Sequence, residues 1–177
     1  MRELWAKIDV NMVQDEKNKL IRSTHDICTA YIVEPQDADL ARKNGARNIV
    51  TTARDANILL VENVDDVARV KEENKTTCAI VTVESKEDEK KIIDLAESLT
   101  DYIVAKFLDW RVIPLENLIA QVHGKSRLLA FASNAQEAKL ALETLEMGTD
   151  GIVAEITDVE EIMKIHDAIK GATSRIS

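Results

Sequence analysis

The chain has 177 residues, of which 45% are hydrophobic and 31% charged, so it has enough apolar material for a buried core and is not a disordered sequence. With 32 acidic against 23 basic residues and only 3% aromatic residues, it lacks the basic stripe and stacking platform of a nucleic-acid-binding protein. Its charge also disfavours binding to an anionic membrane surface, and no apolar run approaches the roughly 20 residues of a membrane span.

The two cysteines, Cys28 and Cys78, both lie inside apolar runs. Such residues are usually buried, reduced thiols rather than parts of a disulfide framework. The amino-terminal residues do not have the layout of a signal peptide. We therefore expect a cytoplasmic protein that interacts with neither membranes nor nucleic acid.

One pattern recurs along the chain: a short apolar run rich in β-branched residues, a polar residue, and then a segment with helical periodicity. Most of the runs are continuously apolar, which is typical of strands buried on both faces of a parallel sheet. The predicted strands are 4–10, 27–33, 48–52, 57–61, 78–83, 102–105, 127–132 and 151–156.

Three predicted helices follow the later strands, over 85–99, 134–146 and 157–169. The first begins with Ser-Lys-Glu-Asp and the second with Asn-Ala-Gln-Glu, so Ser85 and Asn134 are expected to be their N-caps. Between the strands at 48–52 and 57–61 the sequence has no room for a helix.

Alternating strands and helices predict an α/β fold of parallel strands with right-handed crossovers. Eight candidate strands indicate a compact or incomplete TIM-barrel-like architecture, and an open doubly wound sheet is the alternative because such barrels usually exceed about 200 residues. No flexible linker divides the chain, so we expect a single domain over residues 1–177. The edge of an incomplete sheet would favour a homo-oligomer.

Charged side chains follow several predicted strands, and in both architectures ligands bind at the carboxyl ends of the strands. Lys7, Glu84, Lys106 and Glu155 occupy such positions. Lys7 is the strongest candidate, because an unpaired charge within an apolar strand is costly. A lysine there can act as a base or form a Schiff base, and a nearby carboxylate can transfer protons. For each residue the alternative is a role in a cap or turn.

The segment 109–120 combines features of a loop at a binding site with the start of a helix. Pro114 suits the first position of a helix, which would place Glu116 and Asn117 in the first turn, facing the strand ends. Trp110 is a large apolar residue in the preceding loop, as at the mouth of a binding site. The alternative is a packed loop followed by a helix that begins with proline.

Several familiar signatures are absent from the sequence. The five glycines form neither a G-x-G-x-x-G pattern nor a P-loop, so there is no standard dinucleotide fingerprint. The three histidines are scattered without the spacing of metal ligands, and we predict no metal site.

The segment 109–120 resembles a known family. Asp-Trp at 109–110, followed by Ile-Pro-Leu-Glu-Asn-Leu-Ile-Ala at 113–120, is similar to a signature of archaeal-type 3-dehydroquinate synthase, also called dehydroquinate synthase II. Trp-x-Lys at 5–7 agrees with this family, as does Glu-Ala-x-x-Ala at 137–141 leading into Leu-Glu-x-Gly-x-Asp-Gly-Ile at 145–152. The resemblance covers nearly the whole chain but only the amino-terminal half of the family, so it implies a carboxyl-terminal domain as an expected missing part.

The resemblance implies an oxidoreductase of the shikimate pathway, in aromatic amino-acid biosynthesis. Such an enzyme oxidises 2-amino-3,7-dideoxy-D-threo-hept-6-ulosonate, a small amino-keto acid, with NAD. It releases ammonia and closes the ring to form 3-dehydroquinate.

The resemblance also implies roles for individual residues. Lys7, Asp109 and Glu116 would be catalytic, with Lys7 as base or oxyanion partner and Glu116 as an aid to proton transfer. Asn117 would orient the substrate, and Trp110 is a substrate-binding candidate from its place in the loop before the helix. The remaining substrate-binding candidates, which rest on strand-end positions, are Glu84, Glu155 and Lys106.

Two other interpretations remain open at this point. The chain could be a half-length relative without catalytic activity that binds a small molecule or a separate carboxyl-terminal chain. It could also be an unrelated barrel aldolase that forms a Schiff base on Lys7 or Lys106.

Overall fold

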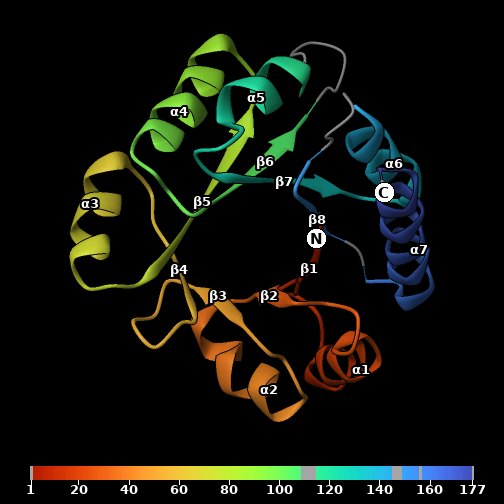
Figure 1. The fold of residues 1–177 in the computed structure, drawn as a ribbon. Coiled ribbons are helices and arrows are strands. Elements are labelled where there is room, and N and C mark those ends of the chain that lie inside the picture. Colours follow the sequence, from red (N-terminus) through yellow and green to blue (C-terminus); the bar gives the residue numbers. More distant parts are fainter. Residues whose placement is uncertain (1, 109–114, 145–148, 156, 177) are drawn as a thin grey trace.

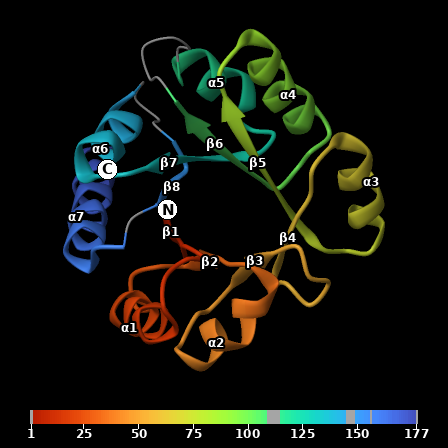
Figure 2. The same cartoon turned by 180° about the vertical axis from the view of Figure 1, so that it is seen from behind.

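The computed structural model describes residues 2–108, 115–144, 149–155 and 157–176. Its eight described strands are all parallel and pair in sequence order, and β8 pairs with β1 to close a barrel (Figure 1). Seven described α-helices surround this barrel, as the view from behind also shows (Figure 2). The TIM-barrel-like prediction is therefore confirmed.

The strands are β1 (Glu3–Lys7), β2 (Ala30–Ile32), β3 (Ile49–Thr51), β4 (Ile58–Leu60), β5 (Thr76–Val83), β6 (Tyr102–Phe107), β7 (Arg127–Ala132) and β8 (Gly151–Ala154). The helices are α1 (Gln14–Thr24), η1 (Pro35–Asp37), α2 (Ala38–Lys43), α3 (Val64–Glu72), α4 (Lys86–Glu97), α5 (Leu115–Val122), α6 (Ala135–Glu143) and α7 (Val159–Ile176).

The alternative of an open doubly wound sheet is wrong. It rested on the length of the chain, which fits a barrel because β2, β3 and β4 have only three residues each and one crossover helix is absent. A closed barrel has no free strand edge, so the edge-based argument for a homo-oligomer does not apply to this chain.

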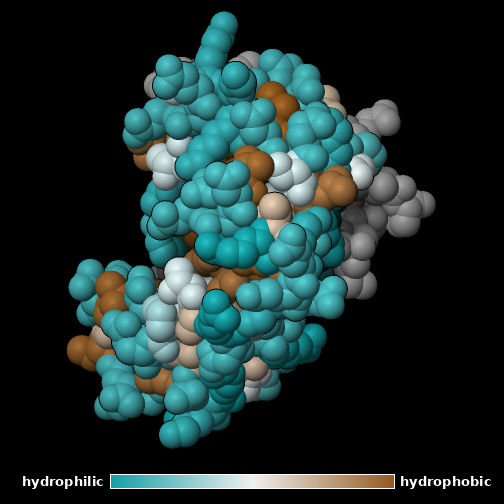
Figure 3. All heavy atoms as spheres, turned by 90° about the vertical axis from the view of Figure 1, so that its left-hand side faces the viewer, coloured by the Kyte–Doolittle hydropathy of each residue, from teal (hydrophilic) through white to brown (hydrophobic). Residues whose placement is uncertain are grey.

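The connection between β3 and β4 contains no helix, as the sequence predicts. The ring of helices therefore has a gap between α2 and α3 (Figure 1). A groove of about 290 Å³ lies between the β3–β4 turn and α3, and apolar side chains of β4 and α3, including Leu59 and Val70, form part of its lining. Viewed from this side, the surface is mostly hydrophilic, with apolar residues visible in a hollow at mid-height (Figure 3).

The predicted N-caps are present. The Asn134 side chain accepts the backbone N–H of Glu137 at 2.9 Å, and Ser85 forms a capping box with Asp88. The helix predicted over 85–99 ends at Glu97, because Leu99 takes a left-handed φ of 59° that terminates the helix.

The last helix, α7, continues to Ile176, seven residues beyond the predicted end at 169. Its buried stripe of Ile162, Ile165 and Ile169 extends to Ala172, so packing sustains another turn.

Side chains along each strand alternate between two apolar layers, because successive residues of a strand point to opposite faces. One layer lies between the sheet and the helices, and the other fills the barrel. In β1, for example, Leu4 and Ala6 belong to the outer layer and the fully buried Trp5 to the inner one. Because the interior is filled, small molecules have access to the barrel at its ends. The buried residues of the inner layer are Trp5, Ala30, Ile32, Val50, Ile58, Cys78, Val104, Leu129, Phe131 and Val153.

Both cysteines are buried and free, as predicted. Burial raises the pKa of Cys28 from 9.0 to about 11 and also raises that of Cys78. Neither thiol has the depressed pKa that marks a reactive cysteine.

Candidate functional site

The carboxyl-terminal end of the barrel carries charged side chains above the filled interior. Lys7 of β1, Lys106 of β6 and Glu155, directly after β8, each lie two residues beyond a member of the inner layer. Because alternate residues of a strand share a face, all three lie on the barrel-facing side of their strands, at the end where ligands bind in barrels of this kind.

These side chains converge around one aromatic ring. The Lys106 ammonium donates to both oxygens of Glu155, at 3.0 and 3.2 Å, and about a third of each side chain is exposed. The Nζ atoms of Lys7 and Lys106 each lie 5.7 Å from the centroid of the Phe131 ring, within the range of a cation–π interaction. Lys7, Lys106, Glu155 and Phe131 together are named the mouth cluster.

The structure therefore brings together three of the residues that the sequence singled out. Their roles remain predictions. Phe131 was not predicted, although its position in the strand gives a signal. It is the last inward-facing residue of β7, one alternation beyond Leu129, and so must lie at the same end as Lys106.

Glu116 and Asn117 lie in the first turn of α5, and both are exposed. Helix α5 ends at Val122, shortly before β7 begins at the amino-terminal end of the barrel. The first turn of α5 therefore lies toward the carboxyl-terminal end. Lys7 and Glu116 thus lie toward the same end of the molecule.

Of the other predicted residues, the structure describes Glu84 but not Asp109 and Trp110. Glu84 is exposed after β5, and its backbone N–H donates to the Asp88 carboxylate at 2.9 Å. Among the described contacts none joins its side chain to the mouth cluster. Asp109 and Trp110 lie outside the described residues.

A buried ion pair supports the connection that follows Lys7. The Lys17 ammonium donates to the Asp37 carboxylate at 2.9 Å and to the Val10 carbonyl at 3.1 Å. The side chains of Lys17 and Asp37 are only 8% and 10% exposed. This pair ties the loop between β1 and α1 to η1, and nothing in the sequence spacing had indicated it.

The opposite, amino-terminal end holds a second polar network, centred on the Glu3 carboxylate. Glu3 accepts hydrogen bonds from Trp5 Nε1 at 3.1 Å, from Thr29 Oγ1 at 3.0 Å and from the Tyr102 hydroxyl at 3.0 Å. Arg127 Nη1 lies 2.6 Å from Oε2 of Glu3, the oxygen that also accepts from Tyr102. Burial and the neighbouring Glu3 carboxylate raise the pKa of Tyr102. This Glu3 network closes the bottom of the barrel.

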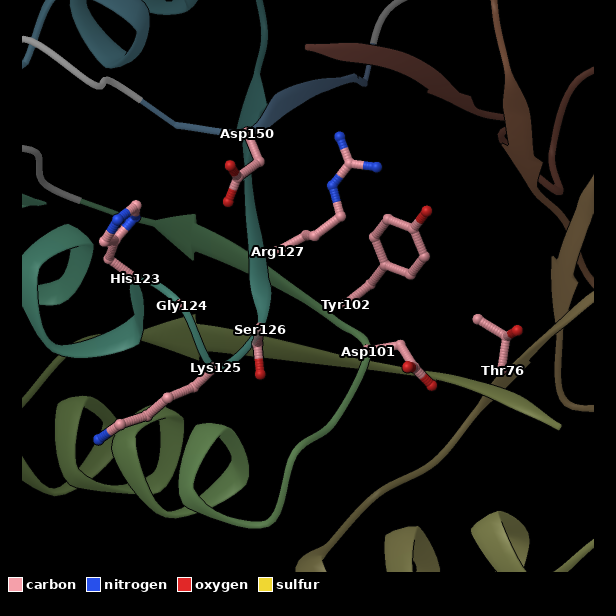
Figure 4. A pocket seen from close by; sticks show the side chains of 9 residues that line it. All are labelled: Thr76, Asp101, Tyr102, His123, Gly124, Lys125, Ser126, Arg127 and Asp150. Carbon is pink, nitrogen blue, oxygen red and sulfur yellow. The ribbon is translucent and has the colours of Figure 1, made fainter. Parts of the chain in front are cut away.

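A depression of about 490 Å³ adjoins this network. Two of its carboxylates are engaged within the protein, since the Asp101 carboxylate accepts the Thr77 backbone N–H and the Asp150 carboxylate accepts that of Leu128. The side chains do not converge on one point, and Lys125 extends away from the others (Figure 4). In barrels of this kind, the residues at the amino-terminal end usually stabilise the fold and do not bind a ligand.

Within the described parts of the chain, no group of His, Cys, Asp and Glu side chains has the arrangement of a metal site. In the same residues, no helix combines the length and the apolar character needed to cross a bilayer.

The family model of the 3-dehydroquinate synthase II N-terminal domain matches residues 1–169. The chain belongs to this family. A 3-dehydroquinate synthase of Methanobrevibacter smithii is 32% identical over 92% of the chain, and one of Methanocaldococcus jannaschii is 33% identical over 91%. A 3-dehydroquinate synthase homolog of Persephonella marina is 33% identical over 94%. The family resemblance drawn from the sequence is confirmed.

The chain spans about half the length of the curated relatives that it matches, namely 50%, 47% and 44% of these three proteins. This agrees with the predicted correspondence to the amino-terminal half of 3-dehydroquinate synthase II.

Solved structures support the fold. Orotidine 5′-monophosphate decarboxylase of Methanocaldococcus jannaschii aligns with a TM-score of 0.73 at 15% identity, covering 95% of this chain and 98% of that one. Phosphoribosylanthranilate isomerase of Thermotoga maritima aligns with a TM-score of 0.64 at 11% identity, covering 97% and 100%. At such identities the likeness concerns the barrel alone.

Proposed function

We propose that this chain is the substrate-binding, amino-terminal part of a 3-dehydroquinate synthase of type II. The reaction would convert 2-amino-3,7-dideoxy-D-threo-hept-6-ulosonate to 3-dehydroquinate by NAD-dependent oxidative deamination and cyclisation. Family membership supports the reaction class. The observation that carries the assignment to this chain is the mouth cluster, in which two ammonium groups and a carboxylate meet at the ligand-binding end of the barrel.

The reaction asks for proton transfers that the side chains at this end can perform. After oxidation at the amine-bearing carbon, an imine must be hydrolysed by an oriented water. The methyl ketone must then be enolised to attack the new carbonyl, which requires a base and a group that stabilises an oxyanion. In this proposal Lys7 serves as base or oxyanion partner, Glu116 assists proton transfer, and Asn117 orients the substrate.

The described residues of this chain do not fit an NAD site. A dinucleotide cradle needs glycines directly after the carboxyl end of a strand, where the backbone can approach the pyrophosphate. The described glycines lie elsewhere. Gly45 and Gly124 each follow a helix and have φ values of 102° and 80°. Gly151 begins β8, and Gly171 lies in α7. We therefore derive no hydride-transfer step from this chain. The proposal assigns NAD binding to the half of the relatives that this chain does not span.

The test mixes the purified protein with the amino-ulosonate and NAD, and follows NADH by absorbance and 3-dehydroquinate by mass spectrometry. The assay is repeated with the polypeptide that corresponds to the second half of the relatives. Product formed in either arm supports the function, and product formed only in the second arm assigns NAD binding to that half. Lys7→Met should abolish product, whereas Lys125→Met, at the opposite end of the barrel, should not. No product in either arm, and no binding of the amino-ulosonate, would refute the proposal.

The pair of lysines around Phe131 also supports a second candidate, a barrel aldolase that uses a Schiff base on Lys7 or Lys106. Borohydride reduction in the presence of a keto-acid substrate would then attach the substrate covalently to one lysine. Mass spectrometry of a digest identifies which one. An unmodified chain after this treatment counts against the aldolase.

A further inference from the structure

The mouth cluster contains one cation that pairs with an anion and one that has no anionic partner among the described residues. Both oxygens of Glu155 lie within hydrogen-bond distance of Lys106 Nζ. In the contacts described for this chain, by contrast, the Lys7 ammonium meets only the face of Phe131. An ammonium group has three donors, so Lys7 retains the capacity to bind an anion.

Glu155 also retains capacity for a second partner. A carboxylate offers about four lone-pair positions, and the single Lys106 nitrogen occupies at most two of them. The side chain is 35% exposed, so another donor can reach it from the mouth. The buried Phe131 ring has its centroid 5.7 Å from each of the two ammonium nitrogens, and gives the site an apolar floor.

A free cation and an accessible anion beside one apolar floor complement a ligand that carries both charges close together. The α-amino acid group is such a ligand, because one carbon separates its carboxylate from its ammonium. A simple carboxylic acid would use Lys7 alone, and a simple amine would use Glu155 alone. The presence of both favours the amino acid.

We propose that Lys7 binds the carboxylate and Glu155 the ammonium of the α-amino acid end of the substrate. Lys106 is then a positioning residue that holds Glu155 toward the mouth. This assignment rests on the proposed function for the identity of the amino acid, and it adds which residue recognises which charge. Of the two roles proposed for Lys7, a charged ammonium on the carboxylate fits the oxyanion partner and not the base. It also gives Phe131 a role as the surface over which the substrate lies.

The experiment measures binding by isothermal titration calorimetry with three probes. These are the amino-ulosonate, its 2-deamino analogue with hydrogen in place of the amine, and its carboxamide analogue with a neutral amide in place of the carboxylate. The unsubstituted protein should bind the amino-ulosonate about 10- to 100-fold more tightly than either analogue, since a hydrogen bond between charged groups is lost in each.

Substitutions then separate the two charges. Lys7→Met should bind the acid and the carboxamide equally, yet still prefer the amine over the deamino analogue. Glu155→Gln should show the reverse pattern. Lys106→Met should weaken amine recognition several-fold, and Lys106→Arg should restore it. Lys125→Met, from the opposite end, should keep both preferences.

The outcomes distinguish this inference from the proposed function. If product forms but Lys7→Met still prefers the acid over the carboxamide as strongly as the unsubstituted protein does, the charge assignment is overturned and the function stands. If no product forms but the two preferences disappear separately as described, the synthase function fails and the amino-acid site stands. Equal binding of all three probes by the unsubstituted protein overturns the assignment.

Discussion

Replacing Glu3 with alanine should lower the free energy of unfolding by about 3–5 kcal/mol, because it leaves the buried Trp5 N–H and the partly buried hydroxyls of Thr29 and Tyr102 without their common acceptor. The Glu3 side chain is only 16% exposed and accepts from Trp5, Thr29 and Tyr102 while pairing with Arg127. The indole N–H of Trp5 lies inside the barrel, and the Arg127 charge would lose this carboxylate partner. The loss is a large share of the roughly 5–15 kcal/mol that stabilises a typical domain.

Urea denaturation followed by far-UV circular dichroism measures this loss directly. For a chain of this size about 2–4 °C of Tm is lost per kcal/mol, so the midpoint of thermal unfolding should fall by roughly 6–20 °C. Glu3→Gln keeps one carbonyl oxygen as an acceptor, so its stability should lie between that of the unsubstituted protein and that of Glu3→Ala. Glu72→Ala, at an exposed position of α3, serves as the matched control and should change stability by less than about 0.5 kcal/mol. A loss below about 1 kcal/mol for Glu3→Ala would show that the Glu3 network is not what holds the bottom of the barrel together.

Three further changes test other contacts. Gly151→Ala should cost about 1–3 kcal/mol, because its Cβ would lie 2.5 Å from the backbone oxygen of Glu3. Lys17→Met leaves the Asp37 carboxylate buried without its partner and should cost about 3–5 kcal/mol, and adding Asp37→Leu should recover most of this. Burial raises the pKa of Cys28 from 9.0 to about 11, so the folded state favours the protonated thiol. The resulting contribution to the free energy of unfolding is complete below pH 9.0, and it is lost as the pH rises to about 11. This loss is about 2–3 kcal/mol, and Cys28→Ala should remove it from the pH profile of urea denaturation.

Each of these predictions has a contrary outcome. An unchanged urea midpoint for Gly151→Ala would mean that β1 and β8 can separate without loss. A double variant of Lys17 and Asp37 no more stable than Lys17→Met alone would mean that the damage is to packing rather than charge. An identical alkaline profile for Cys28→Ala would assign the pH dependence to other groups.

The barrel could be predicted from the sequence because its signals are local. Continuous apolar runs mark strands buried on both faces, and Ser85 and Asn134 mark helix starts through contacts within one turn. The missing helix between β3 and β4 also follows from spacing alone. Closure of the sheet could not be decided in this way, since it depends on β1 pairing with β8, whose contacts join residues at opposite ends of the chain.

The site could be predicted only in part, for a similar reason. The rule that ligands bind at strand ends identified Lys7, Lys106 and Glu155, because it uses the position of each residue in its own strand. Their arrangement around Phe131 depends on which inward-facing residues reach the top of the barrel, which requires the register between strands. A contact such as that between Tyr102 and Glu3, 99 residues apart, leaves no trace in local spacing.

The two polar ends of the barrel are built on the same strands, four residues apart. In β1, Glu3 lies at the bottom and Lys7 at the mouth, and β6 repeats this spacing with Tyr102 and Lys106. Residues four apart in a strand share a face and lie about 13 Å from each other. A filled apolar layer separates the two ends, which is why charges can serve structure at one end and a ligand at the other.

This separation predicts that substitutions at the two ends act independently. Sites more than about 7–10 Å apart without shared partners usually add within about 0.5 kcal/mol. The double variant of Glu3→Gln and Lys7→Met should therefore lose as much unfolding free energy in urea as the two single variants together. Its binding preference between acid and carboxamide should match that of Lys7→Met alone, because the bottom network does not touch the ligand. A coupling above about 1 kcal/mol, or a binding preference altered by Glu3→Gln by itself, would mean that the apolar layer transmits changes between the ends. The mouth cluster could then not be treated as a site independent of the network that closes the barrel.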